Sequence, residues 1–226
     1  MSRSRALGRF GGSCAPGAMA VLAVLLGAVP SAARQVAQDA AAPEEAAAGP
    51  RVEVSVVIET TDGRANPLGT FVIELNTKAA PRHSANFLKL ARQGYYDGTT
   101  FHRIVPGFIV QGGDPLSRTD WRSPRLGTGG PKYTLEPEFG LPHLRGAVAA
   151  ARQGDAVNPK RVSNGSQFFI CLADLPSLDA GKYSVFGRVV SGMDVVDKIA
   201  RVKNAGSRAG NRALERVVMK QVKVEE

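Results

Sequence analysis

A single arginine in an apolar segment is the residue whose type and position most directly suggest chemistry. The segment Phe101–Asp114 reads FHRIVPGFIVQGGD, and it sets Arg103 among apolar side chains with Gln111 further along. A guanidinium stays charged at physiological pH and presents forked N–H donors. We therefore expect Arg103 to face a planar, electron-rich group, either a carboxylate of the chain or a bound substrate. Spacing alone favours an exposed ion pair, the usual role of an arginine.

Alternating apolar residues predict the strands that would position this segment. Val52, Val54, Val56 and Ile58 alternate with mostly polar residues, which is typical of a strand with one buried face. We expect a long turn over 61–69 and a second strand, with further strands after it. The predicted strands after that turn are Phe71–Leu75, Thr100–Ile104, Phe108–Gln111, Ala147–Ala150, Gln167–Leu172, Ser184–Val190 and Arg216–Val224.

Two stretches change to helical spacing. Residues 77–94 have Thr77 as a predicted N-cap, Pro81 in the first turn and Gly94 at the end. A second, shorter helix is predicted over Met193–Ala200. Many short strands with few helices indicate a closed or nearly closed antiparallel barrel.

The N-terminus has the pattern of a segment that directs export. Three early arginines precede an apolar run, Ala18–Val29, and small residues at 31–33. This pattern predicts a signal peptide over 1–33, a flexible Ala/Glu/Pro-rich linker over 34–50, and one folded domain over 51–226. The alternative is an uncleaved anchor, but a spanning helix needs about 20 apolar residues and this run is shorter. We expect an exported protein without a stable membrane anchor.

The positive charge of the chain is spread along it. The formal net charge is +9, and Arg3, Arg5 and Arg9 of the predicted leader contribute to it. The remaining basic residues lack the interleaved aromatic residues of a single-strand nucleic-acid platform. We therefore expect a solvated basic surface and no specific nucleic-acid partner. Charge alone also allows a surface adhesin.

The cysteines and histidines do not form a recognisable metal or redox pattern. Cys14 lies in the predicted leader, so Cys171 would remain alone, without an internal disulfide, as a buried strand thiol. His83, His102 and His143 are widely separated and predict structural roles. No metal and no cofactor is predicted.

Three motifs in order resemble one known family. FHRIVPGFIVQGGD, NGSQFFIC at Asn164–Cys171 and KYSVFGRVVSGMDVVD at Lys182–Asp197 resemble the signature segments of cyclophilins, the cyclosporin-binding peptidyl-prolyl cis/trans isomerases. The resemblance extends over Val52–Val224. It implies a mainly β fold, a closed eight-stranded antiparallel β-barrel capped by two α-helices. It also implies a monomer that acts on proline-containing polypeptides.

The same resemblance implies roles for particular residues. Arg103 falls on the catalytic arginine of the family. Substrate-binding roles are implied for Phe108, Ile109, Gln111, Ala151, Arg152, Gln167, Phe169, Leu178 and Tyr183. Of these, Ala151 and Arg152 match a segment that pairs with the substrate backbone. Because strand neighbours face opposite sides, we expect Phe168 to be core.

The chain departs from the family pattern at several positions. Ile109 stands where methionine is common, which is a tolerated apolar exchange. Tyr183 replaces a histidine, and Pro176-Ser177 stands near the position of a tryptophan that the resemblance associates with cyclosporin binding. The sequence therefore leaves open whether this chain binds cyclosporin. The insertion 115–126, with Trp121, has no counterpart that we can place.

The implied reaction needs only orientation and electrostatics. Rotation about an X–Pro amide has a barrier of about 18–20 kcal/mol because of resonance, and a twisted amide recovers a lone pair on nitrogen. Arg103 would donate a hydrogen bond to that nitrogen chiefly in the twisted state. We expect a prolyl isomerase that assists folding of exported proteins, with the periplasm as its compartment. The alternative is a proline-binding module or holdase chaperone that needs no turnover.

Overall fold

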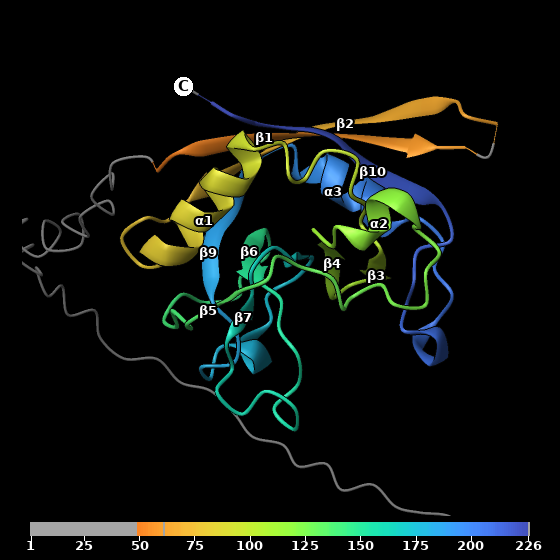
Figure 1. Cartoon of the computed structure of the whole chain (residues 1–226). Helices are drawn as coiled ribbons and strands as arrows, with labels where there is room; N and C mark the ends of the chain where they lie inside the picture. Colours follow the sequence, from red (N-terminus) through yellow and green to blue (C-terminus); the bar gives the residue numbers. More distant parts are fainter. Residues whose placement is uncertain (1–48, 61, 226) are drawn as a thin grey trace, which may run out of the picture. The chain divides into compact units, whose positions relative to one another are not determined.

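The computed structural model describes residues 49–60 and 62–225 (Figure 1). The predicted signal peptide over 1–33 lies outside these residues, as does all of the predicted linker except Gly49 and Pro50. Within the described part of the chain, no helix has the length and hydropathy needed to span a membrane.

Antiparallel strands form most of the described structure. Eight of them make one sheet in the order β10-β1-β2-β9-β6-β8-β4-β3, and β5 and β7 pair separately. The prediction of a mainly β fold with an eight-stranded antiparallel sheet is confirmed. The strands are β1 (Arg51–Glu59), β2 (Ala65–Leu75), β3 (Arg103–Val105), β4 (Ile109–Gly112), β5 (Thr134–Leu135), β6 (Ala147–Ala150), β7 (Ser163–Asn164), β8 (Phe168–Cys171), β9 (Val185–Ser191) and β10 (Arg216–Val224).

The two ends of the strand order are linked by main-chain hydrogen bonds just before β3. The Phe101 N–H donates to the Val217 carbonyl at 2.9 Å, and the Met219 N–H donates to the Thr99 carbonyl at 2.8 Å. These bonds join the segment that leads into β3 with β10, although β3 and β10 themselves form no ladder. Closure of the sheet into a barrel therefore stays a prediction.

Alternation along the strands separates two apolar clusters. Val110 of β4 and Phe168 of β8 belong to the larger cluster, with β1, β2, β10 and the helices. Their neighbours Ile109 and Phe169 belong to a smaller cluster on the opposite face. Successive side chains of a strand point to opposite faces, so each strand serves both clusters. The prediction that Phe168 is core is confirmed, since its exposed fraction is 1%.

The helices cover parts of this sheet (Figure 1). α1 (Pro81–Arg92) and α3 (Met193–Ala200) are the two predicted helices, and α3 has the predicted bounds. α3 buries Val195, Val196 and Ile199 on one face. Because these apolar residues recur at helical spacing, the sequence was sufficient to predict the helix. A short helix that was not predicted, α2 (Leu116–Thr119), lies in the insertion, and single turns form η2 (Pro176–Leu178) and η3 (Ser207–Ala209).

The predicted N-cap of α1 is wrong. The helix begins at Pro81, and the residue before it, Ala80, makes no side-chain capping bond. Instead, the Glu138 carboxylate accepts from the N–H groups of Arg82 and His83, each at 3.0 Å, and from Nδ1 of His83 at 2.6 Å. A carboxylate at a helix N-terminus satisfies donors that have no partner within the helix. The cap comes from a distant loop, so local spacing could not reveal it.

The predicted long turn over 61–69 is also wrong. β2 starts at Ala65 rather than Phe71 and pairs with β1 along its whole length. Pro67 lies opposite Val57, beside a register shift in this pair. β2 pairs with β9 only from Val72 onward, so this end of β2 is an edge where proline costs no hydrogen bond.

Replacing Glu138 with glutamine tests the distant cap. Burial acts to raise the pKa of Glu138, but the hydrogen bonds from His83 and Arg82 outweigh it and leave the pKa below the usual 4.5. The charged carboxylate therefore stabilises the fold above about pH 4.5, and this contribution is lost as pH falls through the lowered value. We expect Glu138→Gln to lower the free energy of unfolding at pH 7 by about 1–2 kcal/mol in urea melts. The difference from wild type should shrink below pH 4.5; a difference that is the same at pH 3 and pH 7 would contradict the cap.

Candidate active site

Strand pairing places the predicted catalytic and binding residues in one row. Arg103 of β3 pairs with Gln111 of β4, and Gln111 pairs with Phe169 of β8. Phe169 in turn pairs with Ala149 of β6. Residues directly opposite each other in antiparallel strands point to the same face, so this row lies on the face of the smaller cluster.

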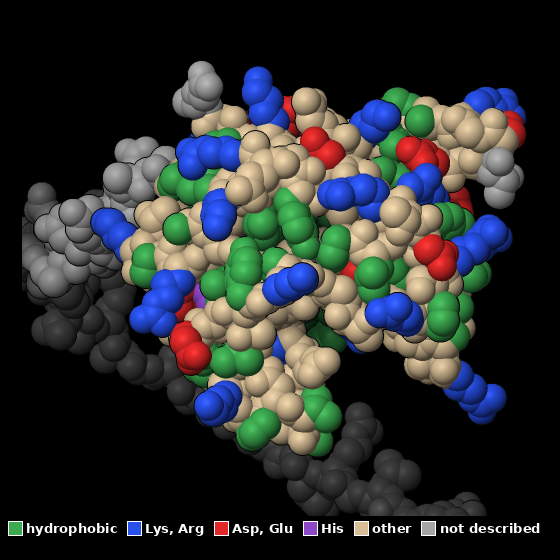
Figure 2. All heavy atoms as spheres, viewed as in Figure 1, with side chains coloured by type: hydrophobic (Ala, Val, Ile, Leu, Met, Phe, Trp, Pro, Cys, Tyr) green, Lys and Arg blue, Asp and Glu red, His purple; other side chains and the backbone are tan. Residues whose placement is uncertain are grey.

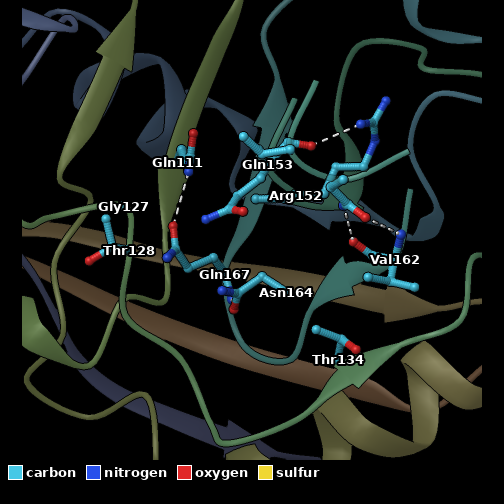
Figure 3. Close-up of a pocket in the computed structure, with 12 residues that line it drawn as sticks. Gln111, Gly127, Thr128, Thr134, Arg152, Gln153, Val162, Asn164 and Gln167 are labelled. Carbon is cyan, nitrogen blue, oxygen red and sulfur yellow. Dashed lines mark hydrogen bonds between the residues drawn. The ribbon is translucent and has the colours of Figure 1, made fainter. Parts of the chain in front are cut away.

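Hydrogen bonds connect the polar members of the site. Arg103 donates from Nη1 to Oε1 of Gln111 at 3.2 Å, and Gln111 donates from Nε2 to Oε1 of Gln167 at 3.1 Å. Gln167 is 2% exposed and donates from Nε2 to the Gly129 carbonyl at 2.7 Å. Figure 3 shows the Gln111 and Gln167 side chains pointing toward each other. The side-chain amides of Gln111 and Gln167 thus orient the Arg103 guanidinium through its Nη1 group.

Arg103 is half-buried and has no acidic partner. Within residues 49–60 and 62–225 it forms no ion pair, so the ordinary salt-bridge interpretation is not supported there. Burial lowers the pKa of Arg103 from its usual value, and Tyr183 acts in the opposite direction. A guanidinium keeps its charge under any such shift, and most of its N–H donors stay available to a bound group.

A cluster of apolar side chains, the candidate proline-binding pocket, lies on the same face of the sheet as Arg103. Ile109 and Phe169 are buried, at 4% and 3% exposure, whereas Phe108, Leu178 and Tyr183 are half-buried and pack against them. All five were predicted as substrate-binding residues, and the structure brings them together in one cluster. Apolar walls next to a cation are suited to a group that is apolar on one side and polar on the other.

Aromatic contacts fix the position of Tyr183. Its ring meets Phe169 edge-on, with centroids 5.3 Å apart and planes at 89°. The guanidinium carbon of Arg152 lies 4.8 Å above the Tyr183 ring, and Arg152 forms an ion pair with Asp155 at 2.6 Å. Tyr183 therefore lines the pocket, and the Arg152 side chain braces it rather than pointing into the site.

Free main-chain groups are found at Arg152 rather than at Ala151. The Ala151 N–H donates to the Gln167 carbonyl at 2.9 Å, and the Ala151 carbonyl accepts from Asn164 at 2.8 Å. Among the described residues, no main-chain hydrogen bond involves Arg152. A substrate strand could therefore pair with both main-chain groups of Arg152, whereas at Ala151 the N–H is already used and only the second lone pair of the carbonyl stays available.

A hollow of about 430 Å³ adjoins this row (Figure 3). Gln111, Ala151, Arg152 and Gln167 line it, as predicted for binding residues. The sequence did not single out its other lining residues, which come from loops and from the two-residue strands β5 and β7, all too short to show periodicity. They are Gly127, Thr128, Thr134, Gln153, Val157, Asn158, Val162 and Asn164.

Buried His143 contacts both Phe169 and the loop that contains Asp179. The His143 ring stacks on Phe169 at 6.2 Å, and Asp179 accepts from Nδ1 of His143 at 2.8 Å and from its main-chain N–H at 2.7 Å. The His143 main-chain bond, followed by the ring bond, lowers the pKa of Asp179. Asp179 directly follows Leu178 of η2, so this contact holds a wall of the pocket in place.

Cys171 of β8 is buried on the same face, which confirms the predicted strand thiol. Burial, with smaller contributions from Asp179 and Asp174, raises its pKa to about 12. The thiol is therefore protonated at neutral pH and is a poor nucleophile. In the described part of the chain, no cluster of three or more His, Cys, Asp or Glu residues could hold a metal ion.

Comparison with known proteins identifies the family. The model of the family described as cyclophilin type peptidyl-prolyl cis-trans isomerase/CLD matches residues 55–224. The chain belongs to this family and has its mainly β fold. It is a peptidyl-prolyl cis-trans isomerase, as the resemblance implied.

Individual relatives agree with this assignment. A peptidyl-prolyl cis-trans isomerase-like 1 of Gibberella zeae is 39% identical over 173 residues, covering 76% of this chain and 95% of the relative. A probable peptidyl-prolyl cis-trans isomerase of Brucella suis is 42% identical over 168 residues, covering 72% and 78% respectively. The crystal structure of a cyclophilin type isomerase of Cryptosporidium parvum has a TM-score of 0.61 at 28% identity, covering 77% of this chain and 98% of its own. The same protein was also solved in the presence of the dipeptide Ala-Pro, with a TM-score of 0.60.

Removing the Asp179 carboxylate tests whether this contact holds the pocket wall. We expect Asp179→Ala to raise KM for an X–Pro peptide by about three- to tenfold, because a lost hydrogen bond costs about 0.5–1.5 kcal/mol. The turnover number should change less, since Arg103 is untouched. Asp179→Asn retains an oxygen acceptor and should restore most of the affinity. A fall in kcat at constant KM would assign Asp179 a different role.

Proposed function

We propose that this isomerase acts on X–Pro bonds of exported polypeptides and that Arg103 is its catalytic residue. The observation that carries the second part is a half-buried guanidinium that has no acidic partner among residues 49–60 and 62–225 and lies beside a cluster of apolar side chains. A proline ring fits the pocket, which leaves the prolyl nitrogen facing the free N–H donors. In this arrangement Arg103 stabilises the twisted amide more than the planar one, and this difference lowers the barrier to rotation about the X–Pro bond.

The size of this effect follows from the hydrogen bond. A hydrogen bond to a charged group contributes about 1.5–3 kcal/mol, and each 1.36 kcal/mol changes a rate about tenfold. Arg103 would thus supply roughly one to two decades of the acceleration. The rest must come from fixing one side of the bond while the other side turns.

Two sets of groups would hold the peptide. Phe108, Ile109, Phe169, Leu178 and Tyr183 would surround the proline ring. Gln111 and the free main-chain groups of Arg152 would hold the flanking peptide. The Cryptosporidium relative solved in the presence of Ala-Pro supports a proline-containing peptide as the ligand class.

Two finer features of the family belong to the same proposal. The hydrogen bonds between the segment before β3 and β10 support a sheet closed into a barrel. At the position that the resemblance associates with cyclosporin, the chain has Pro176-Ser177 in η2 rather than a tryptophan. We expect weak cyclosporin binding for this reason. We also expect a monomer, as the resemblance implies.

The competing hypothesis is a binding module or holdase that needs no turnover. Such a protein would use the same apolar pocket for exposed X–Pro segments. It would have no need of a partly buried cation, whose desolvation costs free energy. Arg103 therefore favours the enzyme, and it also separates the two hypotheses experimentally.

A protease-coupled or NMR exchange assay on a short X–Pro peptide tests the role of Arg103. We expect Arg103→Ala to lower kcat/KM by about ten- to a hundredfold with peptide affinity nearly unchanged. Arg92→Ala, an exposed arginine on α1, is the control and should match wild type. If Arg103→Ala accelerates exchange as well as wild type does, another group is the catalyst. If wild type binds peptide without accelerating exchange, the binding module is correct.

Export is tested at the N-terminus of the mature protein. The arginines, apolar run and small residues before Arg34 support cleavage near residue 33, and the compartment we propose is the periplasm. Sequencing of the exported protein should give an N-terminus close to Arg34. Recovery of the exported protein with Met1 intact would contradict cleavage and favour an uncleaved anchor.

A further inference from the structure

A second hollow lies beside the insertion. It has a volume of about 700 Å³ and shares no lining residue with the hollow next to Gln111. Two segments far apart in the sequence form it, the insertion and the loop that leads into β10. Its lining residues are Trp121, Arg122, Ala205, Arg208, Ala209, Gly210, Arg212, Ala213 and Leu214. We call this surface the arginine groove, after Arg122, Arg208 and Arg212.

The arginine groove contains positive charge without a counter-charge. None of its lining residues is acidic, and within the described ranges none of its three arginines forms an ion pair. The guanidinium of Arg122 lies 4.5 Å from the centre of the Trp121 ring, and its carbonyl accepts from Arg212 at 3.3 Å. Figure 2 shows Lys and Arg side chains, with Asp or Glu side chains between them, over the part where Figure 1 draws α2 and the chain leading into β10. These contacts hold the cations next to an aromatic surface.

The groove adjoins β3, the strand that contains Arg103. Arg212 and Arg103 form an isolated antiparallel bridge, and the Ile104 N–H donates to the Asn211 carbonyl at 2.9 Å. Residues paired in this way present their side chains to the same face, and like charges directly opposite are destabilising. Burial lowers the pKa of His102 to about 4, and both Arg103 and Arg212 act in the same direction. A bound anion would relieve this repulsion.

We propose that the arginine groove binds an acidic segment of the polypeptide whose proline occupies the pocket next to Arg103. This substrate preference rests on the proposed function of Arg103. Guanidinium forks match carboxylates in a bidentate geometry. An extended peptide rises about 3.3 Å per residue, so the acidic residues lie within a few positions of the proline. A single tryptophan is not a stacking platform for successive bases, which favours a peptide over a nucleic acid.

Peptides of matched sequence test this preference. The probes contain one Ala-Pro and a run of aspartates on either its N-terminal or its C-terminal side, and their counterparts carry asparagine instead. For one of the two orientations, we expect kcat/KM about five- to tenfold higher with aspartate than with asparagine, as two or three exposed ion pairs would give. The preference should fall toward unity at about 0.5 M NaCl, because salt screens exposed charges.

Variants assign the preference to the groove. Arg122→Gln combined with Arg208→Gln removes two exposed charges and should abolish the preference. Lys89→Gln combined with Arg92→Gln removes two exposed charges from α1 and should keep it. Equal thermal melts of both double variants verify that the fold is retained. An equal loss of preference in both variants would assign the effect to net charge and overturn the groove.

Fluorescence separates binding in the groove from catalysis. Trp121 is the only tryptophan of the chain, so its emission reports on the groove. A proline-free aspartate peptide should change this emission in wild type and in Arg103→Ala, but not in Arg122→Gln/Arg208→Gln. If Arg103→Ala keeps full activity, Arg103 is not the catalytic residue. The fluorescence evidence for binding in the groove would still hold in that case. The groove proposal is wrong if aspartate and asparagine peptides behave alike. It is also wrong if an oligothymidylate or a phosphatidylglycerol vesicle changes the emission at lower concentration than the aspartate peptide.

Discussion

The two-residue alternation of β4 and β8 is the constraint on which both the core and the site depend. Both strands are buried on their two faces, so Val110 and Phe168 serve the larger cluster while Ile109 and Phe169 form the pocket floor. A slip of one residue in either strand would exchange these sets. The same register aligns Arg103, Gln111 and Phe169 in one row. Stability and catalysis are thus coupled through one pairing.

The charge of Arg103 is held in place by neutral groups. Gln111 and Gln167 form an amide relay that ends on the Gly129 carbonyl, so the guanidinium is oriented without being neutralised. A carboxylate in the place of Gln111 would orient the arginine equally well, but it would compete with the substrate for the same donors. In the mechanism that we propose, orientation by amides would leave the positive charge available to the prolyl nitrogen of the twisted amide.

Loops far apart in the sequence complete the structure through buried or capping polar contacts. Glu138 caps α1, Asp179 holds His143, and Asp155 pairs with both Arg152 and Arg161 around the loops that flank the pocket. Each contact satisfies main-chain or charged groups that would otherwise be buried without partners. The insertion uses the same means, because Asp114 accepts from the N–H groups of Leu116 and Gly127. These contacts hold the irregular segments in defined positions around the site.

The sequence by itself determined the strand pattern, the positions of α3 and β10, the family, and a set of candidate residues that the structure brings together around one pocket. Those features follow from side-chain periodicity and from motifs contained in short segments. Only the tertiary structure decided that Glu138 caps α1, that Arg103 has no acidic partner among the described residues, that Arg152 braces Tyr183, and that Trp121, Arg208 and Arg212 line one hollow. These arrangements bring together residues from distant segments, and local spacing contains no information about which loops lie side by side once the sheet has formed.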